Sequence, residues 1–197
     1  MKKAFIGVDP GKAGFFTIFV NGEYTFYPMP THKVETGELL KSGKPKMRTE
    51  FHEAGLKTLV YEIHSKVKGC ELHACIEKVI GRQGWSAERN FEFGRVAGLQ
   101  KMVLIMLNAK IEMTRPQKWQ SVMYQDFDRI MVPSSTGKTM VHDTKATSKM
   151  VAPILAPNII FSKQGVLKKD GTTHNIDDNK TDSFLICTYI QKKIENN

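Results

Sequence analysis

Short apolar runs alternate with turn-forming residues at the start of the chain. Three of them, at 4–9, 15–20 and 24–29, are separated by Pro-Gly and Asn-Gly pairs that are typical of tight turns. This pattern predicts an antiparallel meander of three strands. Two further runs, at 72–79 and 110–114, predict a fourth and a fifth strand, and the first of them is apolar enough to be buried on both faces.

Longer segments with apolar residues at helical spacing lie between and after these strands. They predict helices at 50–67, 86–108, 115–124, 143–155 and 177–195. Ser86 or Asn90 is expected to cap the second of these helices. Strands that alternate with helices in this order predict an α/β fold with one mixed sheet.

Two segments show neither the strand nor the helix spacing of apolar residues. Residues 31–49 are rich in Lys, Gly, Thr and Ser, and residues 126–142 are basic, so both are expected to be flexible surface loops. The stretch SSTGKT at 134–139 resembles the end of a phosphate-binding loop, but Val132 stands where that motif requires glycine. With 197 residues, the chain is expected to form a single domain over 1–197.

Composition and charge narrow the class of partner. Hydrophobic residues make up 41% and charged residues 25%, as in ordinary globular proteins. The formal net charge of +9 favours a polyanionic partner, nucleic acid before an anionic membrane surface, although a generally solvated basic protein carries such a charge as well.

The three cysteines form no Cys-x-x-Cys pair, which argues against a disulfide framework or a zinc site and favours a reducing, cytoplasmic location. No run approaches the length of a membrane span, and the polar residues at 9–12 interrupt the only stretch that could pass for a signal peptide. We therefore expect no membrane association.

Four acids are placed where they could meet. Asp9 ends the first predicted strand and Glu77 lies near the end of the fourth. Asp178 and Asp182 are four residues apart on the last helix, so they share one face, and the apolar residues that continue that face must point to the core. The two aspartates are therefore expected to point towards the edge of the sheet, although any one of the four could be a solvated surface residue.

Four ionised carboxylates in one pocket repel one another, and burial increases the cost. A pair of divalent cations removes this conflict, and oxygen ligands without a His or Cys cluster suit Mg²⁺, with Mn²⁺ as a substitute. Two such ions suit the attack of water on a phosphodiester. His174 precedes the closing acids and is a candidate for proton transfer, although a surface position fits it better.

Five ordered segments resemble one family. They are IGVDPGKAGF, IEKV with the following GRQGWS and NFEFGRVAG, RPQKWQSVM, DTKATSKMVAPILAP and DDNKTDSFLIC. Together they resemble the RuvC-type Holliday junction resolvases of the RNase H-like superfamily, in particular the phage-type branch.

The resemblance implies an RNase H-like fold with a mixed five-stranded sheet flanked by helices. It also implies a homodimer that cleaves four-way DNA junctions symmetrically with two Mg²⁺ ions, bound by Asp9, Glu77, Asp178 and Asp182. For a phage protein, the host cytoplasm would be the location. Asp177 competes with Asp178 as the third acid, and we favour Asp178 because its spacing from Asp182 keeps both on one helix face.

Basic and aromatic residues near these acids are the expected DNA contacts. They are Lys12, Arg82, Gln83, Trp85, Arg89, Lys118, Lys145 and Lys149. The apolar face of the helix at 90–107 is expected to serve both the core and a two-fold partner. Phe91 and Phe93 are more consistent with core or dimer contacts than with wedges between bases.

The leading hypothesis is a Mg²⁺-dependent crossover junction endodeoxyribonuclease that makes paired symmetric nicks. A broader nuclease for branched DNA or flaps, or an RNase H-like enzyme that cleaves RNA, would use the same acids. A junction-binding protein without catalytic activity is the third hypothesis.

Overall fold

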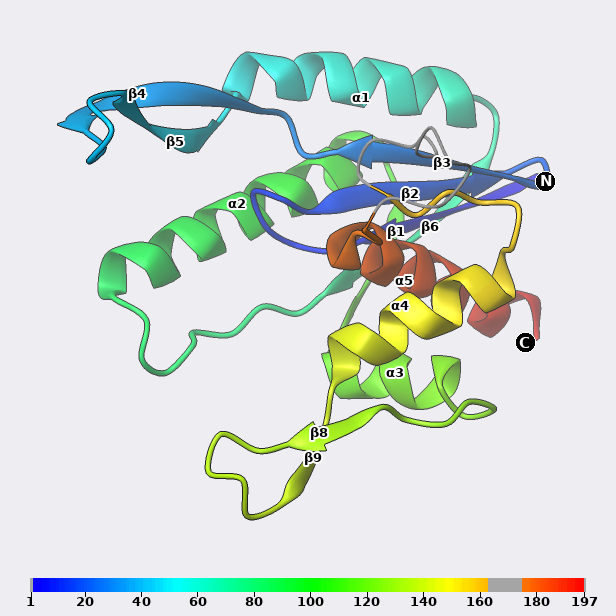
Figure 1. The fold of residues 1–197 in the computed structure, drawn as a ribbon. Coiled ribbons are helices and arrows are strands. Elements are labelled where there is room, and N and C mark those ends of the chain that lie inside the picture. The colour runs from blue at the N-terminus through cyan, green and yellow to red at the C-terminus, as the bar shows by residue number, and fades with distance from the viewer. Residues whose placement is uncertain (1, 163–174, 197) are drawn as a thin grey trace.

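The computed structural model describes residues 2–162 and 175–196. A five-stranded sheet with the order β3-β2-β1-β6-β7 forms its centre (Figure 1). Its strands are β1 (Lys3–Val8), β2 (Phe15–Val20), β3 (Glu23–Pro28), β6 (Glu71–Glu77) and β7 (Lys110–Thr114). β1, β2 and β3 form the predicted antiparallel meander, whereas β6 and β7 run parallel to β1. This arrangement confirms the predicted α/β fold with a mixed five-stranded sheet flanked by helices.

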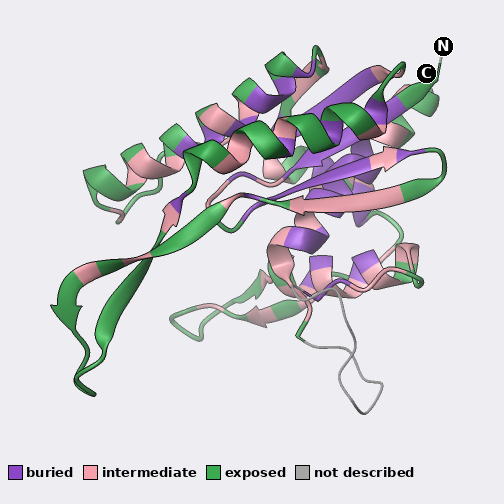
Figure 2. Ribbon diagram, turned by 90° about the horizontal axis from the view of Figure 1, so that it is seen from above, coloured by how far each residue is buried: buried purple, intermediate pink, exposed green. Residues whose placement is uncertain are grey.

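Helices cover both faces of the sheet. They are α1 (Glu53–Val67), α2 (Ala87–Met106), α3 (Pro116–Met123), α4 (Thr144–Leu155) and α5 (Asp178–Glu195). Because side chains alternate along a strand, Ile6 of β1 packs with α1 and α2, while the neighbouring Phe5 packs with α3, α4 and α5. Two hydrophobic cores therefore enclose the sheet, and β1 and β6 are buried on both faces (Figure 2).

β1 and α5 approach each other closely at Gly7. A Cβ atom at this position would lie 2.2 Å from the backbone nitrogen of Cys187 and 2.3 Å from the carbonyl oxygen of Ser183. A buried hydrogen bond of 2.8 Å between the hydroxyls of Thr17 and Ser183 joins α5 to β2 as well. The absence of a side chain at residue 7 thus sets how near α5 comes to the sheet.

The prediction of loops at 31–49 and 126–142 is wrong in secondary structure. The first segment forms a hairpin of β4 (Thr31–Leu39) and β5 (Pro45–Phe51), and the second contains a short hairpin of β8 (Met131–Pro133) and β9 (Met140–His142). Most residues of these strands are exposed on both faces, so no alternation of polar and apolar residues marks them in the sequence. Because β5 includes residues 50 and 51, α1 begins later than predicted.

The start of α2 agrees with one of its two predicted caps. The hydroxyl of Ser86 accepts a hydrogen bond from the backbone N–H of Arg89, so Ser86 rather than Asn90 caps α2. Asp143 and Asp177 cap α4 and α5 in the same way. None of the helices in the described residues has the length and apolar character needed to cross a membrane.

Candidate active site

The four predicted acids lie at one end of the sheet. Asp9 directly follows β1, and Glu77 is the last residue of the parallel strand β6, where Val8 pairs with Ile76. Asp178 opens α5, and Asp182 follows one turn later. Burial raises the pKa of Asp9, and repulsion by the other three acids raises it further, so the fold brings together carboxylates that are far apart in the sequence.

These carboxylates are within electrostatic range of one another but are not in ligand geometry. In the described part of the chain, no group of three or more His, Cys, Asp or Glu side chains is arranged so that it could hold a metal ion as placed. The donor chemistry nevertheless suits Mg²⁺, since every acid offers hard oxygen atoms. Burial together with mutual repulsion makes ionisation of Asp9 and Asp182 costly, and a bound divalent cation would offset that cost.

Burial is the main reason why Asp9 and Asp182 hold their protons. It raises the pKa of Asp9 well above the ordinary value, and repulsion from Asp182, Glu77 and Asp178 adds to this effect. Burial also raises the pKa of Asp182 to about 7, although the hydroxyl of Ser148 donates a hydrogen bond to the carboxylate and lowers the pKa in part. Asp9 and Asp182 therefore favour the protonated form more than an exposed aspartate does.

Glu77 is held in place by an indole. The Nε1–H of Trp119 on α3 donates to Oε2 of Glu77 over 2.9 Å, and the Trp119 side chain is fully buried. Burial raises the pKa of Glu77, while the bond from Trp119 and the positive charge of Arg82 lower it. Trp119 therefore orients one carboxylate oxygen of Glu77.

Lys145 is the basic residue that contacts Asp178, the third of the four acids. Its ammonium group, on α4, forms an ion pair with Asp178. Burial alone would raise the pKa of Asp178, but the bond from Lys145 and nearby positive charge, including that of Lys149, outweigh burial and lower it. The side chain of Asp177 instead accepts the backbone N–H of Lys180 over 3.0 Å as the helix cap. The structure thus distinguishes Asp178, which faces Lys145, from Asp177, which caps α5.

Trp119, Ser148 and Tyr124 are site residues that the sequence reasoning did not assign. The hydroxyls of Tyr124 and Ser148 lie 2.6 Å apart, so they form a buried chain that ends at Asp182. Trp119 and Ser148 both lie in segments that resemble the RuvC-type family, and a polar Ser148 within the apolar face of α4 was a further signal. Nothing in the sequence pattern distinguishes Tyr124 from an ordinary core residue.

Aromatic and basic side chains cluster where α2 begins. The guanidinium carbon of Arg89 lies 3.8 Å from the ring centre of Trp85, and that of Arg82 lies 4.7 Å from it. Phe93 packs edge-on against Trp85 at 5.7 Å between ring centres. Phe91 is 74% exposed, so it contributes nothing to the core. A cavity of about 640 Å³ runs from this cluster to Lys145 at the acids.

The remaining predicted DNA contacts are less concentrated. Lys12 forms an ion pair with Glu92 over 2.9 Å at the same cavity, and Gln83 is exposed in the loop before α2. Lys118 is paired with Glu112 over 3.7 Å in a separate charged cluster on β7 and α5. His174 lies outside the described residues.

The raised pKa of Asp182 predicts a pH-dependent stability of the metal-free protein. Between the ordinary pKa of 3.8 and about 7, the folded state holds a proton that the unfolded chain has released. The free energy of unfolding should therefore fall as the pH rises through this window, by up to about 1.4 kcal/mol per pH unit. Urea unfolding in a chelator between pH 4.5 and 8 measures the slope. The slope of the unfolding free energy against pH should be smaller in Asp182→Asn. Equal slopes in the variant and the wild type would contradict the assignment of this pKa to Asp182.

If the four acids hold Mg²⁺, removing the indole donor should weaken its binding and with it any Mg²⁺-dependent cleavage. Trp119→Phe leaves the partly buried Glu77 without its hydrogen bond, which should raise the pKa of that carboxyl further. Loss of such a supporting bond costs about 10- to 100-fold in metal affinity or activity. The Mg²⁺ concentration that gives half-maximal cleavage should rise accordingly, with the rate recovering at high Mg²⁺. An unchanged Mg²⁺ dependence would show that Trp119 only fills the core.

Comparisons with known proteins find likeness in structure alone. No protein-family model and no curated protein matches the sequence. Among solved structures, the chain resembles T. thermophilus RuvC in complex with a Holliday junction substrate, with 9% identity, a TM-score of 0.48, and coverage of 98% of this chain and 96% of that chain. A T. thermophilus RuvC structure matches with 12% identity, a TM-score of 0.43 and the same coverage of both chains.

Proposed function

We propose that this protein is a Mg²⁺-dependent endonuclease that resolves four-way DNA junctions by paired symmetric nicks. One observation carries the proposal. Four acids from three distant segments meet at the end of a mixed sheet, where burial and mutual repulsion raise the pKa of Asp9 and Asp182. A protein gains nothing in stability from such a cluster, so a cationic ligand is the physical reason to keep it.

Each side chain has a defined task in this proposal. Asp9, Glu77, Asp178 and Asp182 would hold two Mg²⁺ ions, which supply a nucleophilic water and stabilise the charge on the leaving oxygen. Trp119 and Ser148 orient the carboxylates of Glu77 and Asp182.

The basic residues would then align the DNA strand. Lys145 stands at the rim of the acids, with its side chain 68% exposed, and is placed to contact a phosphate. The stack of Arg82, Trp85 and Arg89 offers cations for the backbone and an aromatic face for an unstacked base.

Symmetric nicks require two active sites, and a homodimer would provide them. An apolar groove of about 580 Å³ between α1 and α2 is suited to the contact between copies. Its rim carries the exposed side chains of Tyr61, Met102 and Met106. This groove supports the proposal that α2 serves a two-fold partner as well as the core.

Cleavage of a substrate panel tests the proposal. The purified protein is incubated with a four-way junction, a fork, a flap, a linear duplex and an RNA–DNA hybrid, with Mg²⁺ or with a chelator. The junction should be nicked at symmetric positions only with Mg²⁺. Equal cutting of linear duplex would exclude junction selectivity, and preference for the flap or the hybrid would favour the broader nuclease. Junction binding without cutting would favour the non-catalytic hypothesis.

A further inference from the structure

The β4–β5 hairpin extends from the protein without packing against it over most of its length. Figure 2 shows it projecting from the core, with nearly all of its surface exposed. Within the two strands only Phe51, at the base, is buried. With so few buried residues, this arm makes little contribution to the core. A two-stranded hairpin without such packing is at best marginally stable in water.

The tip of the hairpin is an ordered turn that presents two leucines. The backbone N–H of Leu40 donates to the carbonyl of Lys44, and that of Gly43 donates to the carbonyl of Leu40, both over 2.8 Å. Gly43 has a φ of 76°, which a residue with a side chain rarely adopts. Leu39 is 69% exposed and Leu40 is 48% exposed. Adjacent leucines on a free tip have no structural role within the chain.

Positive charge surrounds these leucines. The basic residues of the hairpin are Lys33, Lys41, Lys44, Lys46 and Arg48. Lys46 pairs with Glu38 over 2.7 Å, and Arg48 pairs with Glu50. Among the described residues, no carboxylate pairs with Lys33, Lys41 or Lys44. The charge without a counterion is therefore concentrated near the tip.

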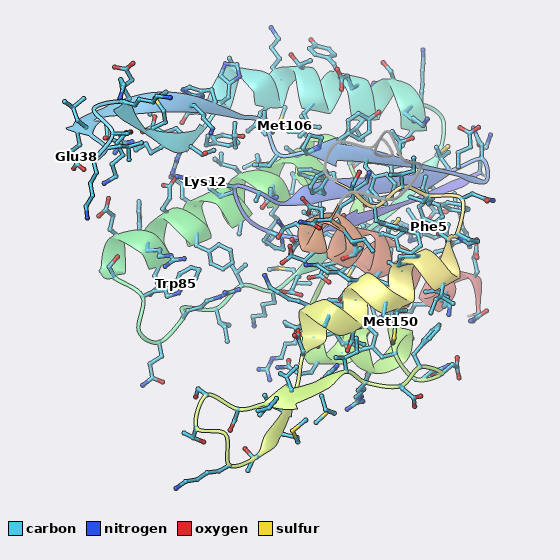
Figure 3. All side chains as sticks on the ribbon, in the orientation of Figure 1. Phe5, Lys12, Glu38, Trp85, Met106 and Met150 are labelled. Atoms are coloured by element: carbon cyan, nitrogen blue, oxygen red, sulfur yellow. The ribbon has the colours of Figure 1, made fainter. Side chains whose placement is uncertain are left out.

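The arm projects on the side of the molecule where α2 begins (Figure 1). Figure 3 shows Glu38 near the free end of the hairpin and Trp85 near the start of α2 on the same side, with Lys12 between them. A strand of seven residues such as β5 spans roughly 23 Å, which equals about seven base pairs of duplex. The arm is thus long enough to lie along about seven base pairs of a duplex that passes the start of α2.

The composition of the arm argues against a second protein copy as its occupant. Edge strands that carry lysines and proline resist pairing with another strand, and Pro45 lies beside Leu39 in the ladder. Lysines that flank an apolar tip instead match DNA, where cations meet phosphates and apolar side chains such as leucine enter the minor groove.

We propose that the β4–β5 hairpin is an arm that grips the duplex flanking the cleavage site. Lys41 and Lys44 contact phosphates on both sides of the minor groove, and Leu39 and Leu40 contact its floor. This inference rests on the proposed function, since it assumes that branched DNA occupies the acid-bearing end of the sheet. It adds a second contact with DNA, far from the catalytic acids.

The test measures binding to a four-way junction with arms of 20 base pairs, with Ca²⁺ in place of Mg²⁺. Lys41→Gln/Lys44→Gln should weaken binding about 3- to 30-fold and reduce the slope of log affinity against log salt by 1 to 2, since each phosphate contact contributes about 0.9. Leu39→Ser/Leu40→Ser should weaken binding without changing that slope. Hydroxyl-radical protection along one duplex arm should shorten in both variants.

Lys68→Gln/Lys192→Gln is the matched control, because it removes two exposed lysines near the C-terminal ends of α1 and α5. It should leave affinity and protection close to wild type. If Lys41→Gln/Lys44→Gln binds DNA with the affinity and salt slope of the wild type, the proposed role of the arm is wrong. The proposed nuclease function is not affected by that result. A change of oligomeric state in Leu39→Ser/Leu40→Ser, with DNA affinity per protomer retained, would identify the tip as a protein contact and overturn the proposal. Failure of the wild type to bind any DNA would overturn both proposals.

Discussion

Asp9→Asn is expected to bind a four-way junction and to leave it uncut. Asp9 is repelled by each of the other three acids, and the change removes one of the proposed anionic ligands while it retains the size of the side chain. Loss of a metal-bound charge costs several kcal/mol of transition-state stabilisation, so cleavage should fall by about 10³-fold or more. The rate of nicking under single-turnover conditions measures the effect, and gel retardation of the same junction measures binding.

Asp177→Asn provides the matched control for this loss. It removes an acid that neighbours Asp178 in the sequence but whose side chain caps α5. Asparagine caps helices as well as aspartate does, so fold and cleavage should both be retained. If Asp9→Asn cuts as fast as the wild type, or Asp177→Asn loses cleavage as fully as Asp178→Asn, the assignment of the acids is wrong.

Gly7→Ala is expected to cause the largest loss of stability. The added Cβ would overlap backbone atoms of Ser183 and Cys187, and neither strand nor helix can yield by moving a flexible side chain. Overpacking typically costs about 1 to 3 kcal/mol, and overlap with backbone atoms places this variant at the upper end of that range. Because α5 also carries Asp178 and Asp182, any variant that folds by displacing the helix should lose cleavage too. Urea unfolding and the junction assay measure the two effects.

Gly98→Ala in α2 is the corresponding control. A Cβ at Gly98 meets no atom within 4 Å, and the residue lies in the interior of a helix. Alanine is preferred to glycine there by about 1 kcal/mol, so this variant should be slightly more stable than the wild type. Equal stability of Gly7→Ala and the wild type would mean that α5 does not pack on β1 as the structure has it.

The elements of the central sheet were predictable because burial leaves a mark on their sequence. β1, β2 and β6 are apolar on both faces, and turn residues separate β1 from β2. The helix starts were predictable from Ser86, Asp143 and Asp177, whose side chains bond to backbone within the same first turn. The two hairpins at 31–51 and 131–142 were not, because strands without a buried face follow no periodic pattern.

The sequence alone placed an acid at the end of each of two strands and two acids one turn apart on a helix, because these positions follow from local periodicity. Their meeting depends on Gly7, which allows α5 to approach β1, and on the parallel pairing of β1 with β6. The hydrogen bonds of Trp119 to Glu77 and of Ser148 to Asp182 join residues 42 and 34 positions apart. Contacts at such separations are made by packing rather than by local pattern, so only the tertiary structure decided them.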